Sequence, residues 1–344
     1  MNTVPSAQSR TLHELPLLVT MGDPAGIGPE IIVRAFEKGE LGAALVLGSP
    51  AVLRRAGSKM TACIESPADL HLVPRGCLPV LHPPGVPDDL VNLPLGQVHA
   101  RCGAAAAACI EAAVAWMQSG QGRAIVTAPI HKEALSAAGV PYPGHTEMLQ
   151  ALATPAGQAS APVRMMLANE ELRVVLVTIH LSLRRAIEAV TFDAVLQTLL
   201  IAQRAAAAWD LPRPRPRIAV AGLNPHAGEG GLFGDEELLI IAPAVKAAVA
   251  LGLDVTGPLA PDTVFMRARR GEFDIVVAMT HDHGLIPVKY LGVEQGVNVT
   301  LGLPFVRTSP DHGTAFDIAG RGMADPASLI SALRMAKRLS RAGL

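Results

Sequence analysis

The feature that most constrains the fold is an alternation, along the whole chain, of short aliphatic runs with alanine-rich stretches. Runs rich in Val, Leu and Ile are typical of buried parallel strands, and the stretches between them have the composition of connecting helices. The pattern predicts strands at 15–21, 43–48, 124–129, 172–179, 217–223 and 273–280, and helices at 104–118, 192–209, 236–251 and 326–341. We therefore expect an α/β protein with a parallel sheet.

Chain length and composition bear on the number of domains. A chain of 344 residues exceeds the size at which one hydrophobic core keeps growing, so two domains around a cleft are expected. Half of the residues are hydrophobic but only 3% are aromatic, so small aliphatic side chains must fill the cores, and stacking platforms for nucleic-acid bases are not expected. Segments 153–162 and 211–217, rich in small residues and proline, are predicted to be surface connections.

The charge balance gives no reason to expect nucleic-acid or membrane partners. The chain has 29 Lys and Arg residues against 30 Asp and Glu residues, so its net charge of -1 creates no field that attracts polyanions. The first fourteen residues are polar and do not resemble a signal peptide, and no uninterrupted apolar run has the length of a membrane span. The four cysteines lack C-x-x-C spacing, which favours reduced thiols and a cytoplasmic location.

Three histidines follow predicted strands. His180, His226 and His281 each come within three residues after one of the last three predicted strands. In open parallel sheets ligands bind beyond the carboxyl ends of the strands, so three imidazoles there can converge on one point. Neutral imidazole is the commonest metal ligand, and three of them leave a coordination position open for a substrate. The alternative is that these are ordinary loop histidines, since eleven histidines will leave several near strand ends by chance.

Two glycine-rich segments adjoin predicted helices. Segment 224–237 surrounds His226 with glycines and ends in Asp235, Glu236 and Glu237, which suit a helix N-terminus. Segment 22–30 follows the first strand and opens a helix, so its amides can hold an anion. A simpler interpretation stays open for both: the acids are helix caps, and the glycines serve helix entry alone.

Four motifs carry a resemblance to a known family: MGDPAGIGPEI (21–31), GHTEML (144–149), NPHAGEGGLFGDEE (224–237) and DHGTAFDIAGRG (311–322). From about Leu17 onward the chain resembles the 4-hydroxythreonine-4-phosphate dehydrogenases. The resemblance implies an isocitrate/isopropylmalate dehydrogenase-like fold, with two α/β/α domains flanking a cleft, and a homodimer whose active sites draw on both subunits. It implies a cofactor-side domain at 15–137 plus 308–344, and a domain for metal, substrate and dimerisation at 138–307.

The resemblance also implies a chemistry. The family oxidises 4-phosphooxy-L-threonine with NAD in pyridoxal phosphate biosynthesis, using a divalent metal ion such as Zn, Mg or Co. Carried over residue by residue, the metal ligands fall on His180, His226 and His281, and the substrate contacts fall on His145, Thr146, Lys289, Asn298 and Arg307. Asp262 matches an acidic position that lines the site. The cationic side chains among these can meet phosphate or carboxylate charge.

Residues 312–326 further resemble the adenosine-binding loop of isopropylmalate dehydrogenases. The resemblance puts three residues at the cofactor: His312 near the adenine, Thr314 within the binding loop, and Asp317 near the ribose hydroxyls. A carboxylate there accepts hydrogen bonds from both hydroxyls and repels a 2′-phosphate, which favours NAD over NADP. The alternative is that Asp317 caps the helix that follows it.

The implied reaction is a metal-assisted hydride transfer. A metal ion at the secondary hydroxyl of the substrate favours loss of its proton, and hydride then passes to nicotinamide. The resulting β-keto acid loses carbon dioxide to give 3-amino-2-oxopropyl phosphate. Lys289 is favoured as the proton acceptor, although it must first be deprotonated, and Asp262 is the alternative that needs no such activation.

One segment departs from the family pattern. Where the family usually has Tyr-His-Asp-Gln-Gly, this chain has Thr280-His281-Asp282-His283-Gly284. His283 adds an imidazole that can compete for the metal, but the spacing to the downstream motifs favours His281. The change leaves the substrate open, because relatives act on erythronate or threonate 4-phosphate. Two further alternatives are an acyl or phosphate transferase of related fold, against which the cofactor-type loop argues, and a binding protein that has lost catalysis.

Overall fold

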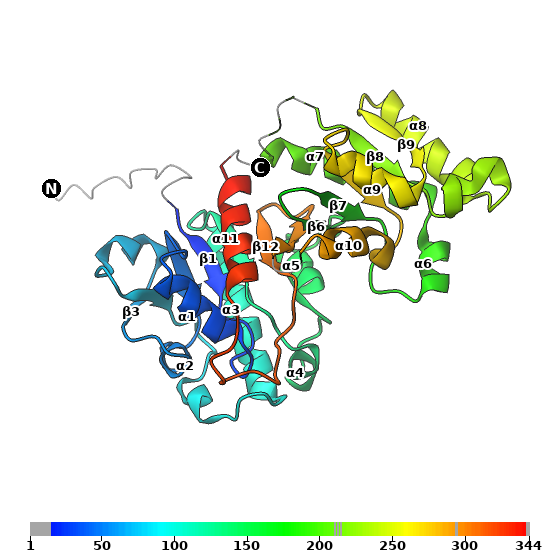
Figure 1. Cartoon of the computed structure of the whole chain (residues 1–344). Helices are drawn as coiled ribbons and strands as arrows, with labels where there is room; N and C mark the ends of the chain where they lie inside the picture. The colour runs from blue at the N-terminus through cyan, green and yellow to red at the C-terminus, as the bar shows by residue number, and fades with distance from the viewer. Residues whose placement is uncertain (1–14, 210, 212, 214, 293–294, 342–344) are drawn as a thin grey trace.

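The computed structural model describes residues 15–209, 211, 213, 215–292 and 295–341, and the twelve strands in these residues form one sheet (Figure 1). The strands are β1 (Leu17–Thr20), β2 (Ala44–Leu47), β3 (Thr61–Ile64), β4 (Leu78–Leu81), β5 (Ala124–Thr127), β6 (Arg164–Ala168), β7 (Arg173–Leu176), β8 (Ile218–Ala221), β9 (Val255–Leu259), β10 (Ile275–Ala278), β11 (Val297–Leu301) and β12 (Arg307–Pro310). All six predicted strands are confirmed, as β1, β2, β5, β7, β8 and β10.

The sheet consists of two parallel blocks that run in opposite directions. Its strand order is β3-β4-β2-β1-β5-β12-β11-β6-β7-β10-β8-β9. The first six strands pair in parallel, and so do the last four. Between the blocks, β11 pairs antiparallel with both β12 and β6, and β6 pairs antiparallel with β7. We call these three antiparallel pairings the central seam. The expectation of a parallel sheet is therefore right within each block and wrong at the seam.

Short connections explain the antiparallel seam. Residues 169–172 join β6 to β7, and the Asn169 side chain closes this turn because its Oδ1 accepts hydrogen bonds from the amides of Glu171 (2.9 Å) and Leu172 (2.7 Å). Residues 302–306 join β11 to β12 in the same way. Connections of this length can only link antiparallel strands, because a parallel crossover needs a dozen or more residues.

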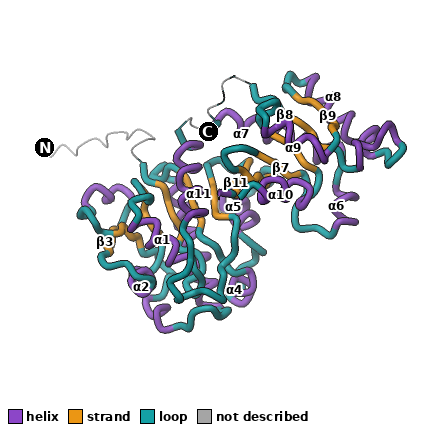
Figure 2. The backbone as a smooth tube through the Cα atoms, viewed as in Figure 1, coloured by secondary structure: helices purple, strands orange, loops and turns teal. Residues whose placement is uncertain are grey.

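Helices pack on both faces of the sheet and bury its aliphatic side chains (Figures 1 and 2). They are α1 (Gly28–Glu37), α2 (Pro50–Arg55), α3 (Ala100–Gln118), α4 (Lys132–Ala137), α5 (His145–Ala153), α6 (Leu183–Ala189), α7 (Phe192–Ala205), α8 (Ala242–Ala250), α9 (Pro261–Arg269), α10 (His281–Tyr290) and α11 (Ala327–Leu339), with 3-10 turns at Pro67–Leu72, Asp88–Asn92, Ala206–Ala208 and Pro225–Gly231 and a π turn at Glu237–Ile241. Successive side chains of β1 point to opposite faces: Val19 shares a core with α1 and α11, and Leu18 shares another with α3.

The four predicted helices are confirmed with shifted ends. α3 begins four residues before the predicted start, and α7 ends at Ala205 and continues as a 3-10 turn. The helix predicted at 236–251 begins with the π turn, and α8 follows it. α3 is long and apolar enough to cross a membrane, but half of that stretch is buried in the fold, where it packs on β1, α4 and α5. A core helix meets the same criteria of length and hydropathy.

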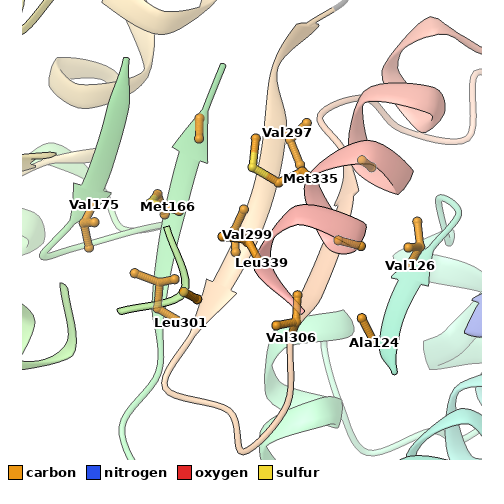
Figure 3. Packing of buried hydrophobic residues seen from close by; sticks show 14 of the residues in the cluster. Ala124, Val126, Met166, Val175, Val297, Val299, Leu301, Val306, Met335 and Leu339 are labelled. Atoms are coloured by element: carbon orange, nitrogen blue, oxygen red, sulfur yellow. The ribbon is translucent and has the colours of Figure 1, made fainter. Parts of the chain in front are cut away.

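The largest core cluster crosses the seam. It combines Ala124 and Val126 of β5 with Val297 and Val299 of β11, Met166 of β6 and Val175 of β7, and Met335 and Leu339 of α11 lie beside them (Figure 3). Burial of each Val, Leu or Met side chain of this cluster stabilises the fold by roughly 1.5–3 kcal/mol. The two parallel blocks therefore share one continuous core, and the limits of the expected domains stay a prediction.

Candidate active site

One cleft, with a volume of about 730 Å³, lies where strands of both blocks end. β5, β7, β10 and β12 or the loops just after them contribute to its wall, together with the first turn of α5. Eight of the predicted site residues line this cleft: His145, Thr146, His180, His281, Lys289, Asn298, Arg307 and His312. Residues separated by more than a hundred positions therefore meet in one place. The strand-end argument accounts for His180 and His281, because they follow the parallel neighbours β7 and β10.

His180 and His281 face each other in this cleft. Their ring centres are 5.6 Å apart, because β7 and β10 are parallel neighbours and each histidine follows one of them. Burial, then the positive charges of Lys132 and His281, lower the pKa of His180, which favours the neutral imidazole that binds metals. Nδ1 of His281 lies 2.7 Å from the Asp282 carboxylate, an arrangement that leaves its Nε2 for a ligand.

His226 lies in a different hollow of the chain. It belongs to the turn Pro225–Gly231, its ring contacts Phe233 at 6.0 Å between centres, and it lines a hollow of about 560 Å³ with Asp262. Within the described ranges, no three His, Cys, Asp or Glu side chains come close enough together to hold a metal ion. A single copy of the chain thus brings two of the three predicted ligands together and keeps the third, with Asp262, apart.

Glu237 holds the turn that carries His226. Its buried carboxylate accepts hydrogen bonds from the amides of Leu223 (2.6 Å) and Asn224 (2.8 Å) and from the Asn224 side chain (2.9 Å). Burial favours the protonated acid, but the hydrogen bonds from Asn224 and Leu223 outweigh it, so the pKa of Glu237 is lowered. The acid is therefore more than a helix cap: it fixes the backbone that precedes His226.

The backbone at two of the predicted metal ligands is strained. His180 has φ 49° and His226 has φ 51°, both in the left-handed region that side chains with a Cβ rarely occupy. Such a conformation costs about 1–2 kcal/mol per residue and persists where the surrounding structure determines it. The strain therefore coincides with two positions that the sequence pattern selects for chemistry.

Arg307 is a buried cation at the wall of the cleft. Its side chain donates hydrogen bonds to the hydroxyls of Thr300 (3.0 Å) and Thr127 (2.6 Å), its Nε has no partner, and no carboxylate among the described residues pairs with it. Burial lowers the pKa of Arg307 to about 10, which still leaves it charged at neutral pH. Burial, then the charge of Arg307, holds the pKa of His145 well below its ordinary value, and the buried Nε2 of His145 also lacks a partner. This wall is suited to an anion.

Residues on the two sides of α10 line two different hollows. Lys289 and His281 line the large cleft, and Lys289 Nζ forms an ion pair with Asp311 Oδ2 at 2.9 Å. His283 lies on the other side of the helix, in the hollow of His226, and burial lowers its pKa. The structure therefore brings His281, and not His283, next to His180.

The loop that resembles an adenosine-binding loop packs against the glycine-rich segment 22–30. The amide of Ile27 donates to the carbonyl of Thr314 at 3.0 Å, and a Cβ on Gly26 would come within 2.9 Å of the same oxygen. Asp317 is exposed in a turn, and α11 begins only at Ala327, whose amide Asp325 accepts at 2.9 Å. The alternative that Asp317 caps a helix is therefore wrong.

Several residues of this region were not selected as site residues from the sequence. Lys132 and Glu147 line the large cleft, and Asp311 pairs with its lysine. Burial raises the pKa of Asp23 to about 6, against a hydrogen bond from Ala25 and the charge of His131. Asp23 Oδ2 and His131 Nδ1 are buried and have no hydrogen-bond partner in the part of the chain that the structure describes. The motif containing Asp23 gave a hint, but only tertiary contacts reveal the unsatisfied atoms.

Comparison with known proteins gives a consistent result. A family model described as pyridoxal phosphate biosynthetic protein PdxA matches residues 40–336. The 4-hydroxythreonine-4-phosphate dehydrogenase of Beijerinckia indica is 53% identical over 94% of this chain and 95% of the relative, and the D-threonate 4-phosphate dehydrogenase of Pectobacterium atrosepticum is 44% identical over 94% and 99%. The crystal structure of 4-hydroxythreonine-4-phosphate dehydrogenase from Klebsiella pneumoniae superimposes with a TM-score of 0.86 at 43% identity, covering 95% of this chain and 98% of that one.

Proposed function

Because the chain belongs to the PdxA family of pyridoxal phosphate biosynthetic proteins, we propose that it oxidises the secondary hydroxyl of 4-phosphooxy-L-threonine with NAD and a divalent metal ion. The product is a β-keto acid that decarboxylates to 3-amino-2-oxopropyl phosphate. The observation that carries this proposal is the combination, in one cleft, of the His180–His281 pair with Lys289 and the unpaired, buried Arg307. Such a cleft offers metal ligands and anion-binding groups side by side.

The facing histidines fit a divalent ion. Two imidazoles on one ion each place a nitrogen about 2 Å from it, so their ring centres stand roughly 5 Å apart. The 5.6 Å between His180 and His281 is compatible with this geometry. His226 supplies the third ligand in the proposal, and the ion is Zn, Mg or Co. When bound, the metal ion lowers the pKa of the substrate hydroxyl, and NAD accepts the hydride.

We propose that His226 reaches the metal of a second copy in a homodimer. Its separation from the other two histidines within one chain supports this arrangement. Large apolar side chains in the segment that follows His226 are exposed, namely Leu232 (72%), Phe233 (47%), Leu238 (53%) and Leu239 (67%), and large exposed apolar patches are typical of protein interfaces. Asp262 shares the hollow of His226, so it would enter the same site from the partner.

The side chains of the cleft divide the remaining work. His145, Thr146, Asn298 and Arg307 bind and orient the substrate, and Lys289 takes the hydroxyl proton. Asp311 holds Lys289 in place through their ion pair. Lys289 remains the favoured proton acceptor because it lines the same cleft as His180 and His281 of its own chain. Asp262, which would enter from the partner with His226, is the alternative.

The proposed NAD site is the loop that contains His312, Thr314 and Asp317. His312 lines the cleft, which connects this loop to the reaction centre, and the exposed Asp317 carboxylate is free to accept from ribose hydroxyls. Asp23 Oδ2 and His131 Nδ1 have no hydrogen-bond partner in the described structure. A ligand group with both a donor and an acceptor, such as a carboxamide, could bond to both atoms.

D-threonate 4-phosphate is the second candidate substrate. Relatives named D-threonate 4-phosphate dehydrogenase are 44% identical to this chain, close to several relatives named for 4-hydroxythreonine 4-phosphate. The two substrates differ in the group next to the oxidised carbon, an amine or a hydroxyl, and both carry phosphate and carboxylate. A transferase function has less support, because the family relatives are named as dehydrogenases.

The test is a substrate screen. Purified protein is incubated with NAD, one divalent metal ion and either 4-phosphooxy-L-threonine, D-threonate 4-phosphate or erythronate 4-phosphate, and NADH is followed by absorbance. We expect the highest kcat/KM with 4-phosphooxy-L-threonine and no NADH after chelation of the metal. NADH production from threonate 4-phosphate alone would establish the second candidate, and no NADH from any of the three would refute the dehydrogenase proposal.

A further inference from the structure

Lys132 is a cation of the cleft to which the proposed function gives no role. It is the first residue of α4, it lines the same cleft as His180 and Arg307, and its side chain is exposed. Glu147 lines this cleft too, but no carboxylate of the described residues lies within ion-pair distance of Lys132. By contrast, Lys289 already has a carboxylate partner in Asp311. Lys132 is therefore available to pair with an incoming anion.

The amino end of α5 lies beside the Lys132 side chain. A Cβ built on Gly144, the residue that precedes α5, would be 3.8 Å from Cε of Lys132. Gly144 gives α5 no side-chain cap, so the amides of the first turn, beginning at His145, lack helical partners. Helix amino ends carry a partial positive charge and bind phosphate groups readily.

A second observation at the same wall indicates an anionic ligand. Arg307 is 3% exposed, its Nε has no partner, and it lines the cleft together with Lys132. The buried Nε2 of His145, in the first turn of α5, also lacks a partner. Unsatisfied buried groups cost free energy unless a ligand or water completes them. Among the described residues, Lys132 and Arg307 thus line the cleft without an ion-pair partner, and the proposed substrate has two anionic groups, a phosphate and a carboxylate.

We propose that Lys132, together with the uncapped amino end of α5, binds the phosphate group of the substrate. This inference rests on the proposed function, since it assigns one end of the same phosphorylated acid. The compact ammonium of lysine acts as a point charge toward phosphate, and the helix amides supply directed donors beside it. Lys132 is a substrate-binding residue in this arrangement and takes no proton in the reaction.

The experiment compares ligands with and without phosphate. Binding of 4-phosphooxy-L-threonine and of 4-hydroxy-L-threonine is measured by calorimetry, with the metal-loaded protein, for the native chain, Lys132→Met and Lys132→Arg. A charge-assisted hydrogen bond supports a loss of roughly tenfold to a hundredfold in affinity when one partner is removed. We expect that loss for the phosphorylated ligand with Lys132→Met, unchanged affinity for the unphosphorylated ligand, and partial recovery with Lys132→Arg.

A matched control shows whether the loss of affinity depends on the position of the lysine or only on the net charge of the protein. Lys38, an exposed lysine at the end of α1 and outside the cleft, is replaced in Lys38→Met, which should bind both ligands as the native chain does. Equal losses for both ligands with Lys132→Met would overturn the phosphate assignment and point to the carboxylate. Unchanged binding of the phosphorylated ligand would overturn the inference while leaving the proposed function intact. Native protein that binds both ligands equally would refute the phosphate site and weaken the proposed function as well.

Discussion

Lys289 and Asp311 form an ion pair across the cleft, with Nζ and Oδ2 2.9 Å apart. The aspartate side chain is almost buried, at 9% exposure, whereas the lysine keeps 40% of its surface. The pair ties the last turn of α10 to the end of β12, so it connects the element that begins with His281 to the strand that begins with Arg307. It therefore fixes the position of the proposed proton acceptor relative to both metal and substrate groups.

Replacing this lysine should remove turnover and preserve the fold. Proton transfer by a positioned side chain accelerates reactions by about 10²–10⁴-fold, so Lys289→Met is expected to lower kcat by at least about 10²-fold. Asp311→Asn should lower kcat less, because the lysine remains and only its positioning weakens. Steady-state kinetics check both, with Lys59→Met as the exposed control. Near-native turnover in Lys289→Met would instead identify Asp262 as the acceptor.

Mixed dimers test the shared metal site. His226→Ala and His281→Ala should each be inactive alone. In a dimer that contains one subunit of each kind, the site using His281 of the first and His226 of the second is intact, so random mixing should restore about a quarter of native activity. Metal analysis and size measurement by light scattering accompany the assay. No recovery, in dimers shown to have exchanged subunits, would mean that all three histidines act within one chain.

Arg307→Met should weaken substrate binding without lowering the stability of the fold. The native guanidinium is buried and has no carboxylate partner among the described residues, so an apolar side chain of similar length removes a desolvated charge. We expect a Tm equal to or higher than the native value together with a KM at least about tenfold higher, the equivalent of one charged hydrogen bond. Thermal unfolding and kinetics on the same sample give both numbers. A lower Tm with native KM would assign the arginine a purely structural role.

Glu237→Gln should destabilise the protein in a pH-dependent way. Because the pKa of Glu237 is lowered in the fold, its ionised form stabilises the folded state above the ordinary pKa and this contribution is lost as the pH falls through the lowered value. At neutral pH we expect a loss of about 1–3 kcal/mol in the free energy of unfolding, shrinking below about pH 4. Urea unfolding at several pH values measures it. Glu229→Gln, in the same loop but exposed, is the control, and a pH-independent difference would contradict the assignment.

Asp317 is expected to control the choice of dinucleotide. Asp317→Asn removes the charge that repels a 2′-phosphate, so the preference for NAD over NADP, measured as a ratio of kcat/KM values, should fall about tenfold or more. Asp325→Asn, an exposed aspartate that accepts from the first turn of α11, is the matched change nearby and should leave the ratio unchanged. An unchanged ratio in Asp317→Asn would remove the proposed role of its carboxylate.

The strands that sequence reasoning found are uninterrupted aliphatic runs, and burial alone was not enough, since the fully buried β4 was missed. β1, β5 and β10 read as aliphatic runs because helices cover both of their sides. The sequence pattern missed β12 because its buried residues, including Thr308 and Ser309, are polar. It missed β9 because Gly257 and Pro258 interrupt the strand. The antiparallel seam depends on a turn closed by Asn169, which no periodicity reveals.

The candidate site was predictable to the extent that strand ends determine it. His180 and His281 meet because β7 and β10 are neighbours, and β8, which precedes His226, pairs with β10 as well. Strand adjacency alone would have brought all three together. The turn after β8 decides otherwise, since five consecutive positive φ angles from His226 to Gly230 carry the ring into the other hollow. This turn geometry depends on tertiary contacts such as those of Glu237, so it cannot be predicted from the number of residues between β8 and His226.

The left-handed backbone at His180 and His226 has an evolutionary consequence. Glycine adopts this conformation without the penalty of a Cβ, so at both positions the substitution that relaxes the backbone most also deletes an imidazole. Selection for thermal stability therefore favours glycine at these two positions, whereas selection for activity favours histidine. A descendant of this chain that no longer needed the metal would be expected to drift toward glycine there first, and glycine at either place in a relative would mark a protein that has abandoned the reaction.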